Sequence, residues 1–336
     1  MLHALKLSGA MRACAQSEWR RRRLVILCYH GVSIDDEHLW EPALFVSAGW
    51  LEGRLRLLRD SGANVLPLGE AVERLAAGEL PPQSVAITFD DGLHDFYLNA
   101  MPLLRKYGMP ATLYLSTWYC RHPRPVFRVF CSYLLWKGAK AFRGGPLLHL
   151  SNPDLRSAKG RAEALDGILR HVGEQGLSKT DKDALAERLA GELGLDYAAI
   201  LHARILQLMT PQEVGEAAGA GIDIELHTHR HRVPNDKHLF VGEIADNSRE
   251  IEAMTGRRPR HFCYPSGVYE SAFLPWLSEQ GIVSATTCEA GIASRSSHPL
   301  LLPRVIDHCG LSPIEIEGCL SGLSFGLRWQ TYVAAD

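Results

Sequence analysis

The chain has 336 residues, 46% of them hydrophobic, which is enough to bury a sizeable core in one large domain or two smaller ones. Its 36 basic and 38 acidic residues give a formal net charge of −2, which excludes a general electrostatic attraction to nucleic acid. Eight scattered cysteines without a C-x-x-C pair indicate reduced thiols and exclude a small disulfide-stapled domain. We therefore expect a cytoplasmic protein.

The N-terminal segment, residues 1–23, has no continuous apolar run followed by a cleavage site, so we expect neither a signal peptide nor a membrane span. Residues 1–15 fit a weakly amphipathic helix, and four arginines follow at 20–23. We expect these arginines to form a solvated flank. Peripheral contact of this basic segment with an anionic membrane surface is the alternative, so membrane association stays open.

Strand and helix patterns alternate in the first third of the chain. Short apolar, β-branched runs predict strands, and apolar residues three and four apart predict helices. The order of these elements is typical of an α/β fold with a parallel sheet. The predicted strands are 23–32, 84–92 and 110–117, and the predicted helices are 47–65, 68–82 and 95–109.

From residue 118 to 209 the strand signals stop, and charged helices rich in alanine and leucine take their place. The alternation returns where Thr210 would cap a helix that begins at Pro211. We therefore expect a short N-terminal segment, one catalytic domain with a helical insertion, and a tail. Their boundaries are 1–23, 24–320 with the insertion at about 120–209, and 321–336.

Polar residues follow four of the predicted strands, at the edge where α/β folds place their sites. Carboxylates and imidazoles suit Zn(II), Fe(II), Co(II) or Ni(II), and the spacing of His227 and His231 lets both reach one ion. We expect His229 and Arg230, between them, to face solvent. The four groups are Tyr29-His30, Asp90-Asp91, His227 to His231, and Arg304 with Asp307-His308.

Four short motifs, "YHGV", "TFDDG", "HTHRH" and "CYPSG", resemble the polysaccharide deacetylase family, the carbohydrate esterases that share the NodB homology domain. The resemblance implies a distorted (β/α) barrel, here with a helical insertion. It implies Asp91, His227 and His231 as ligands of one divalent ion, usually Zn2+, with Co2+, Ni2+ or Fe2+ as alternatives. It implies Asp90 as the general base that takes a proton from the attacking water.

The third motif departs from the family pattern, because "FCYPSGVY" has Cys263 and Tyr264 where many relatives carry an arginine and paired prolines. It is similar to a branch with a Y-P-x-G segment. By that resemblance, a backbone N–H near Tyr264, in the segment with Pro265 and Gly267, would donate to the oxyanion.

The general acid is less clearly marked, since the usual L-x-H motif is not evident. Deacetylases that act on exported glucosamine polymers have a first strand that ends in Tyr-His. By that resemblance His30 is the favoured acid and His308 the substitute. Arg304 is expected to orient Asp90 or Asp307 through an ion pair.

The expected function is metal-dependent hydrolysis of the acetamide of an N-acetylated amino sugar, with release of acetate. The lack of a signal peptide favours a glycan intermediate or a lipid-linked sugar over an exported polysaccharide. A deacylase of a small N-acylated metabolite and a degenerate, glycan-binding family member are the alternatives. A 2-His-1-carboxylate Fe(II) oxygenase would need a β-rich fold and H-x-D spacing, and neither is present. The sugar, the acyl group, the native metal and the oligomeric state stay open.

Overall fold

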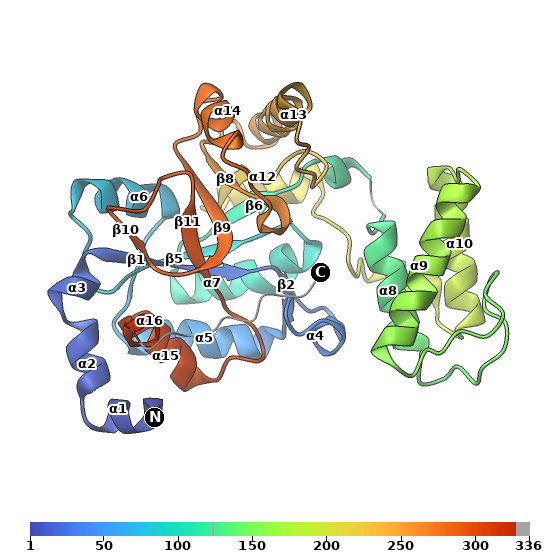
Figure 1. Ribbon diagram of the computed structural model, residues 1–336, viewed down its shortest axis with the longest axis horizontal. Helices are drawn as coiled ribbons and strands as arrows, with labels where there is room; N and C mark the ends of the chain where they lie inside the picture. Colours follow the sequence, from blue (N-terminus) through green and yellow to red (C-terminus); the bar gives the residue numbers. More distant parts are fainter. Residues whose placement is uncertain (123, 327–336) are drawn as a thin grey trace.

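Seven parallel strands close into a barrel in the computed structural model, which describes residues 1–122 and 124–326 (Figure 1). The strands follow one another around the ring in the order β1-β11-β9-β8-β7-β6-β5, and β5 pairs back with β1 to close it. This confirms the expected α/β barrel. The seven strands are β1 (Arg23–Tyr29), β5 (Ser84–Phe89), β6 (Thr112–Leu115), β7 (Asp223–Leu226), β8 (His261–Cys263), β9 (Ser284–Ala290) and β11 (Leu302–Ile306).

Short strands extend the sheet or lie beside it. β10 (Ala293–Ser294) runs antiparallel to β1, and β4 (Asn64–Val65) runs parallel to β5. A separate pair joins β2 (Gly31–Val32) to β3 (Phe45–Val46), directly after the first barrel strand.

Helices surround the barrel and cover the outward faces of its strands. Thr210 caps the helix after the insertion, with Glu213 completing a capping box and Pro211 at the first turn, as the sequence predicts. Residues 95–109 begin with a π-helical turn, Phe96–Ala100, which the sequence did not indicate. The surrounding helices are α5 (Ala48–Asp60), α7 (Met101–Tyr107), α12 (Pro211–Gly219), α13 (Lys237–Thr255), α14 (Phe273–Glu279), α15 (Pro313–Ser321) and α16 (Leu323–Gly326). A further helix, α6 (Leu68–Ala77), packs against the inner residues at one end of the barrel.

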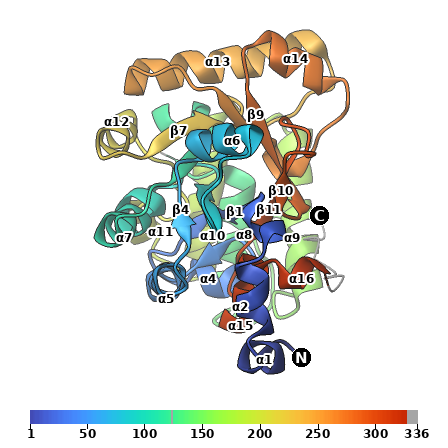
Figure 2. The same ribbon diagram turned by 90° about the vertical axis from the view of Figure 1, so that its left-hand side faces the viewer.

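Strand alternation divides the barrel residues into an outer and an inner set. Alternate residues of β1, such as Leu24 and Ile26, share an inner apolar cluster with Leu68 and Leu75 of α6. Figure 2 shows α6 lying across the barrel. One end of the barrel interior is therefore filled with apolar side chains, and the polar inner residues gather toward the carboxyl ends of the strands.

The N-terminal segment forms α1 (Leu2–Leu7), α2 (Ala10–Ala15) and α3 (Glu18–Arg21). The expected solvated flank is wrong for Arg20, which is fully buried. Its guanidinium donates to the carbonyl oxygens of Leu320 (2.6 Å), Arg23 (2.6 Å) and Ser84 (3.0 Å), so it ties this segment to the base of the barrel. No helix in the described part of the chain is long and apolar enough to span a membrane.

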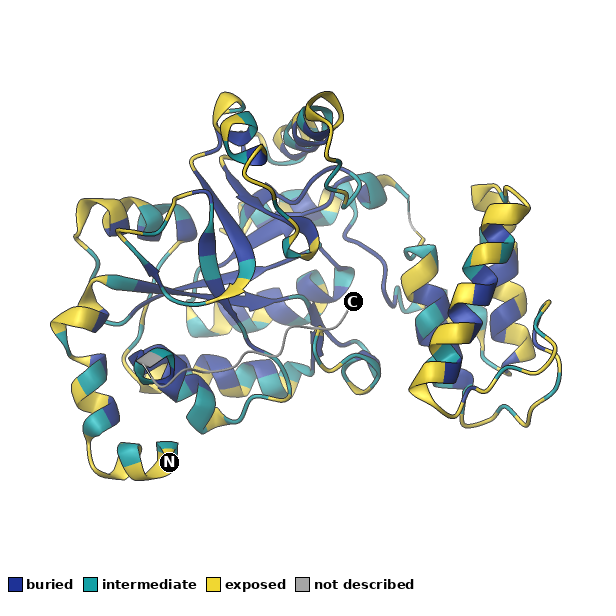
Figure 3. Cartoon of the chain, viewed as in Figure 1, coloured by how far each residue is buried: buried dark blue, intermediate teal, exposed yellow. Residues whose placement is uncertain are grey.

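We call residues 118–209 the helical lobe; it leaves the barrel after β6 and returns before α12. The lobe has its own apolar core, and Figure 3 shows that its helices bury one face each. It contacts the barrel side through α4 (Glu37–Trp40), where the Trp40 ring packs edge-on against Tyr133. Its helices are α8 (Phe127–Gly138), α9 (Ala158–Glu174), α10 (Lys179–Glu192) and α11 (Tyr197–His202).

The predicted tail, 321–336, is only partly described, because residues 327–336 lie outside the described residues. The described part of the tail contains α16, and it is preceded by α15, which we did not predict as a helix. A capping box of Ser312 and Glu315 begins α15.

Candidate metal centre and catalytic site

The two adjacent carboxylates at the end of β5 point into different surroundings. Asp90 continues the inward alternation of the strand, and its side chain is 2% exposed. Asp91 has φ 73°, in the left-handed region, and its side chain is 31% exposed. Gly92 has φ 87°, and a Cβ there would lie 2.2 Å from the Leu115 side chain, so the turn requires glycine. This turn separates the two acids that sequence alone placed side by side.

Asp91, His227 and His231 meet at the carboxyl edge of the barrel. Asp91 Oδ1 lies 3.3 Å from Nε2 of each histidine. Ligands about 2.0–2.1 Å from a zinc ion, in tetrahedral geometry, lie about 3.3 Å from each other. The two distances from Asp91 Oδ1 therefore match the spacing of ligands around such an ion, and the three donor atoms all lie within 4.8 Å of one another.

The tautomer of His227 strengthens this fit. Its Nδ1 lies 2.9 Å from the carbonyl oxygen of Cys263, which only accepts hydrogen bonds, so Nδ1 carries the proton. In the neutral ring Nε2 then directs a lone pair at the Asp91 oxygen, which also carries lone pairs. A cation between Nε2 and the Asp91 oxygen would remove the repulsion between their lone pairs. Histidines that bind metals usually donate their other ring N–H to a backbone carbonyl or carboxylate, as His227 does to Cys263.

The loop after β7 has a strained backbone that turns both histidines toward Asp91. Thr228 and His231 have φ 60° and 53°, a conformation that is uncommon for these residue types and clusters at functional sites. Thr228 Oγ1 accepts the N–H of Arg232 across the turn (3.0 Å).

Asn247 of α13, which the sequence analysis missed, supports this loop from behind. It is fully buried; its Oδ1 accepts the His227 N–H (2.9 Å), and its Nδ2 donates to Thr117 Oγ1 (3.0 Å). The expectation that His229 faces solvent is wrong: this ring is buried, with Nδ1 2.8 Å from Thr117 Oγ1. Arg230 is half-buried and pairs with Glu243 (3.0 Å). The loop is fastened to the barrel rather than solvated.

Arg304 resolves one open alternative, because it pairs with Asp90 and not with Asp307. Its Nη1 and Nη2 donate to Oδ1 and Oδ2 of Asp90 at 2.8 and 2.7 Å, and it is fully buried. Asp307 pairs instead with Arg54 and accepts the Tyr29 hydroxyl. Burial alone would raise the pKa of Asp90, but the Arg304 guanidinium holds it well below its usual range. Asp90 is therefore ionised at neutral pH.

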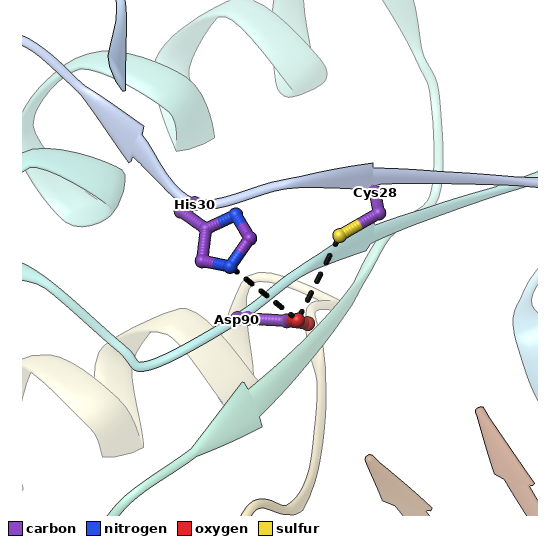
Figure 4. A group of neighbouring side chains, drawn as sticks. All are labelled: Cys28, His30 and Asp90. Carbon is purple, nitrogen blue, oxygen red and sulfur yellow. Dashed lines mark hydrogen bonds and ion pairs between the residues drawn. The ribbon is translucent and has the colours of Figure 1, made fainter. Parts of the chain in front are cut away.

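Asp90 Oδ2 also faces His30 and two thiols. Figure 4 shows Cys28, on β1, and His30, directly after that strand, both directed at Asp90. His30 Nε2 lies 3.8 Å from this oxygen, and the Sγ atoms of Cys28 and Cys263 lie 3.7 and 3.4 Å from it. Burial lowers the pKa of His30, although the charge of Asp90 opposes this. The two cysteines were missed as site residues; Cys28 precedes His30 by two, and this period-2 spacing was the available signal.

His308 lies apart from this group. It is half-buried, and its Nδ1 accepts the N–H of Gly310 (3.1 Å). Within the described residues, none of its hydrogen bonds reaches Asp90 or the three metal-type donors.

The expected oxyanion segment differs in detail from the prediction. The N–H of Tyr264 donates to the Thr286 carbonyl (3.2 Å), and its buried hydroxyl donates to Leu300, so Tyr264 itself offers no free donor. Pro265 has no N–H, and the Gly267 N–H donates back to Tyr264. Among the described residues the Ser266 N–H has no partner, and φ 54° at this residue sets it in a tight turn.

Comparisons with known proteins identify the family of this chain. The family model described as polysaccharide deacetylase matches residues 77–142 and 183–285, half of the chain. YxkH of Bacillus subtilis (strain 168) is 37% identical over 94 residues, 28% of this chain and 32% of its own. A poly-beta-1,6-N-acetyl-D-glucosamine N-deacetylase of Staphylococcus aureus (strain MSSA476) is 38% identical over 72 residues, 21% of this chain and 25% of its own. The chain thus aligns with a third or less of each of these two relatives.

Two solved structures share the fold over most of both chains. A Streptococcus pyogenes deacetylase, in complex with acetate, has a TM-score of 0.59 at 19% identity and covers 88% of this chain and 96% of its own. IcaB from Ammonifex degensii has a TM-score of 0.56 at 18% identity and covers 89% and 97%. With the barrel, the four motifs and the family match over half of its length, the chain belongs to the polysaccharide deacetylase family.

Proposed function

We propose that this protein is a metal-dependent hydrolase that removes the acetyl group from an N-acetylated amino sugar. One observation carries the proposal. Asp91, His227 and His231 present three metal-type donors to one point, while the adjacent Asp90 is ionised and outside that set. Asp91 and Asp90 thus provide the two carboxylate functions that this hydrolysis needs, one for holding an ion and one for moving a proton.

A divalent ion held by Asp91, His227 and His231, with Zn2+ as the expected species and Co2+, Ni2+ or Fe2+ suited to the same donors, would lower the pKa of water and polarise the amide carbonyl. Asp90 accepts the proton of the attacking water. Arg304 positions Asp90 through two parallel hydrogen bonds and keeps it ionised, so its orientation is set before substrate arrives.

His30 is the proposed proton donor to the leaving amine, because its Nε2 lies near Asp90 at the carboxyl ends of the strands, where the three metal-type donors also lie. Its lowered pKa makes the imidazolium a stronger acid, although a smaller fraction of it is present at neutral pH. The Ser266 N–H, free of a protein partner in the described chain, is the proposed donor to the developing oxyanion. His308 has no role in this scheme.

The proposed substrate is an N-acetylated amino sugar within a glycan intermediate, a lipid-linked sugar or a polysaccharide. The names of the Staphylococcus aureus relatives, which act on poly-beta-1,6-N-acetyl-D-glucosamine, support this class. We propose that the helical lobe, which begins at the carboxyl end of β6, forms one wall of the substrate site.

The test is mass spectrometry of N-acetylated sugars, lipid-linked sugars and small N-acyl metabolites after incubation with the purified zinc-loaded chain. We expect a mass loss of one acetyl group in an amino-sugar class, with matching acetate release. Deacylation confined to the small metabolites would replace the proposed substrate. Glycan binding without any acetate release would instead identify a binding protein.

A further inference from the structure

The helical lobe contains a cavity of about 470 Å³ that is separate from the metal centre. None of Asp90, Asp91, His227 or His231 lines it. Its volume is in the range of small-molecule sites and exceeds what a single inorganic ion needs. We call it the basic cavity; its lining residues are Asp36, Trp136, Lys137, Ala139, Lys140, Phe142, Arg143, Arg156 and Arg161.

Positive charge in the basic cavity is largely uncompensated. Lys137 is neutralised by Asp35 and Asp36, at 2.8 and 2.6 Å. The carboxylate of Asp154 accepts from the Ser157 hydroxyl (2.6 Å) and from the backbone N–H of Arg156 (3.0 Å). Within residues 1–122 and 124–326, no carboxylate lies at ion-pair distance from the other four cations. These four are Lys140, Arg143, Arg156 and Arg161.

Two of the arginines are held in place by the backbone. Arg161 is half-buried, and its Nη1 donates to the carbonyl oxygens of Leu155 (3.0 Å) and Arg156 (3.2 Å). Arg143 Nη1 donates to the carbonyl oxygen of Lys140 (3.0 Å). Each guanidinium has five N–H donors, so anchoring Nη1 leaves Nε and Nη2 for a ligand. An anchored planar fork of this kind suits bidentate binding of phosphate oxygens.

We propose that the basic cavity binds a phosphorylated ligand, with a diphosphate as the group whose several negative charges match the four unpaired cations. Trp136 and Phe142 supply an apolar wall for the remainder of that ligand. The phosphate could belong to a free phosphorylated sugar or nucleotide, or to a lipid headgroup. This inference does not depend on the deacetylase reaction.

Isothermal titration calorimetry of the full chain with sodium pyrophosphate, at low salt, tests the proposal. We expect saturable binding that weakens about tenfold or more in Arg161→Gln and in Arg143→Gln, since each change removes charge-assisted hydrogen bonds. Arg170→Gln is the matched control, because Arg170 is exposed on the same helix, α9, outside the cavity lining. It removes one positive charge and is expected to bind as the wild type does.

A second arm distinguishes the sources of the phosphate. Sedimentation with phosphatidylcholine vesicles, with and without phosphatidic acid, reports a lipid headgroup. Binding to phosphatidic acid vesicles that Arg143→Gln weakens, without pyrophosphate binding, supports the headgroup source. The proposal is overturned by the absence of binding in both arms. Equal weakening by Arg170→Gln would also overturn it, because the binding would then be general charge attraction. Far-ultraviolet circular dichroism of each variant checks that the lobe is folded.

Discussion

Arg304 in the barrel and Arg143 in the helical lobe show opposite uses of the same side chain. Arg304 is fully buried and makes a bidentate pair with Asp90, whereas Arg143 is exposed and, among the described residues, donates only to a backbone carbonyl. The first arrangement fixes the orientation of one buried carboxylate. The second leaves positive charge available to a ligand. The comparison shows that the buried arginine orients a carboxylate inside the barrel, while the exposed arginine leaves its charge on the surface of the lobe.

The largest expected effect is on metal binding in the barrel. His227→Ala removes one of the three proposed ligands, so we expect zinc affinity to fall by more than 100-fold, beyond the 10–100-fold typical of changes to residues that only support a ligand. Zinc-dependent acetate release should fall with it. Competition with a chromophoric chelator measures the affinity. Wild-type affinity in this variant would show that the three residues do not form the site.

The contrast between the two arginines gives a stability prediction. Arg304→Met leaves Asp90 as an unpaired buried charge, and we expect the free energy of unfolding to fall by about 3–5 kcal/mol. Arg143→Met, at an exposed position, should change it by less than about 0.5 kcal/mol. Urea denaturation of both variants measures these values. Similar losses in the two would contradict the difference in burial on which the comparison depends.

A substitution in the core of the lobe tests whether the lobe and the barrel unfold independently. Leu189 of α10 is fully buried in the lobe core, so Leu189→Ala is expected to destabilise the lobe by about 2–5 kcal/mol. Hydrogen exchange should then speed up in α8 to α10 and remain slow in β5. Equally faster exchange in β5 would show that lobe and barrel unfold together.

A pH-dependent prediction concerns His261 at the start of β8, away from the metal centre. Burial lowers its pKa to about 4, whereas an unfolded histidine titrates near 6.5. Between these values the unfolded chain binds more protons, so the free energy of unfolding falls as pH falls from 6.5 to 4. Each unit of difference between the folded and unfolded pKa corresponds to about 1.4 kcal/mol, so the expected fall in the free energy of unfolding is about 3 kcal/mol. Urea denaturation of both proteins at pH 7 and pH 4 measures the change, and the contribution of His261 to the fall in the free energy of unfolding should be absent in His261→Asn. An equal fall in the wild type and in the variant would contradict the prediction.

Much of the barrel was predictable, because its strands are short, continuous apolar runs and several of its helices have clear caps. Thr210, Pro211 and the α12 helix show this well. The metal-type triad was predictable from motif spacing and from the resemblance to the family. Arg20 was not, since a run of arginines looks solvated unless the carbonyl groups that it meets, at Leu320 and Ser84, are known.

The surroundings of Asp90 show where local sequence is insufficient. Its pairing with Arg304, over two hundred residues away, depends on barrel closure, and the sequence left Asp307 as an equal alternative. Within the Tyr264 segment, the N–H of Tyr264 itself is not free, because it donates to Thr286 of the adjacent strand β9. Parallel pairing between distant strands decides both outcomes, and one-dimensional patterns do not report it.

The most direct test of the proposed mechanism is Asp90→Asn, assayed for bound zinc and for acetate release on the same preparation. Because Asp90 lies outside the metal-type triad, zinc content should stay at the wild-type level. Loss of the proposed base should lower acetate release by about 10²–10⁴-fold. Unchanged acetate release at full zinc content would contradict the role of Asp90 as the general base.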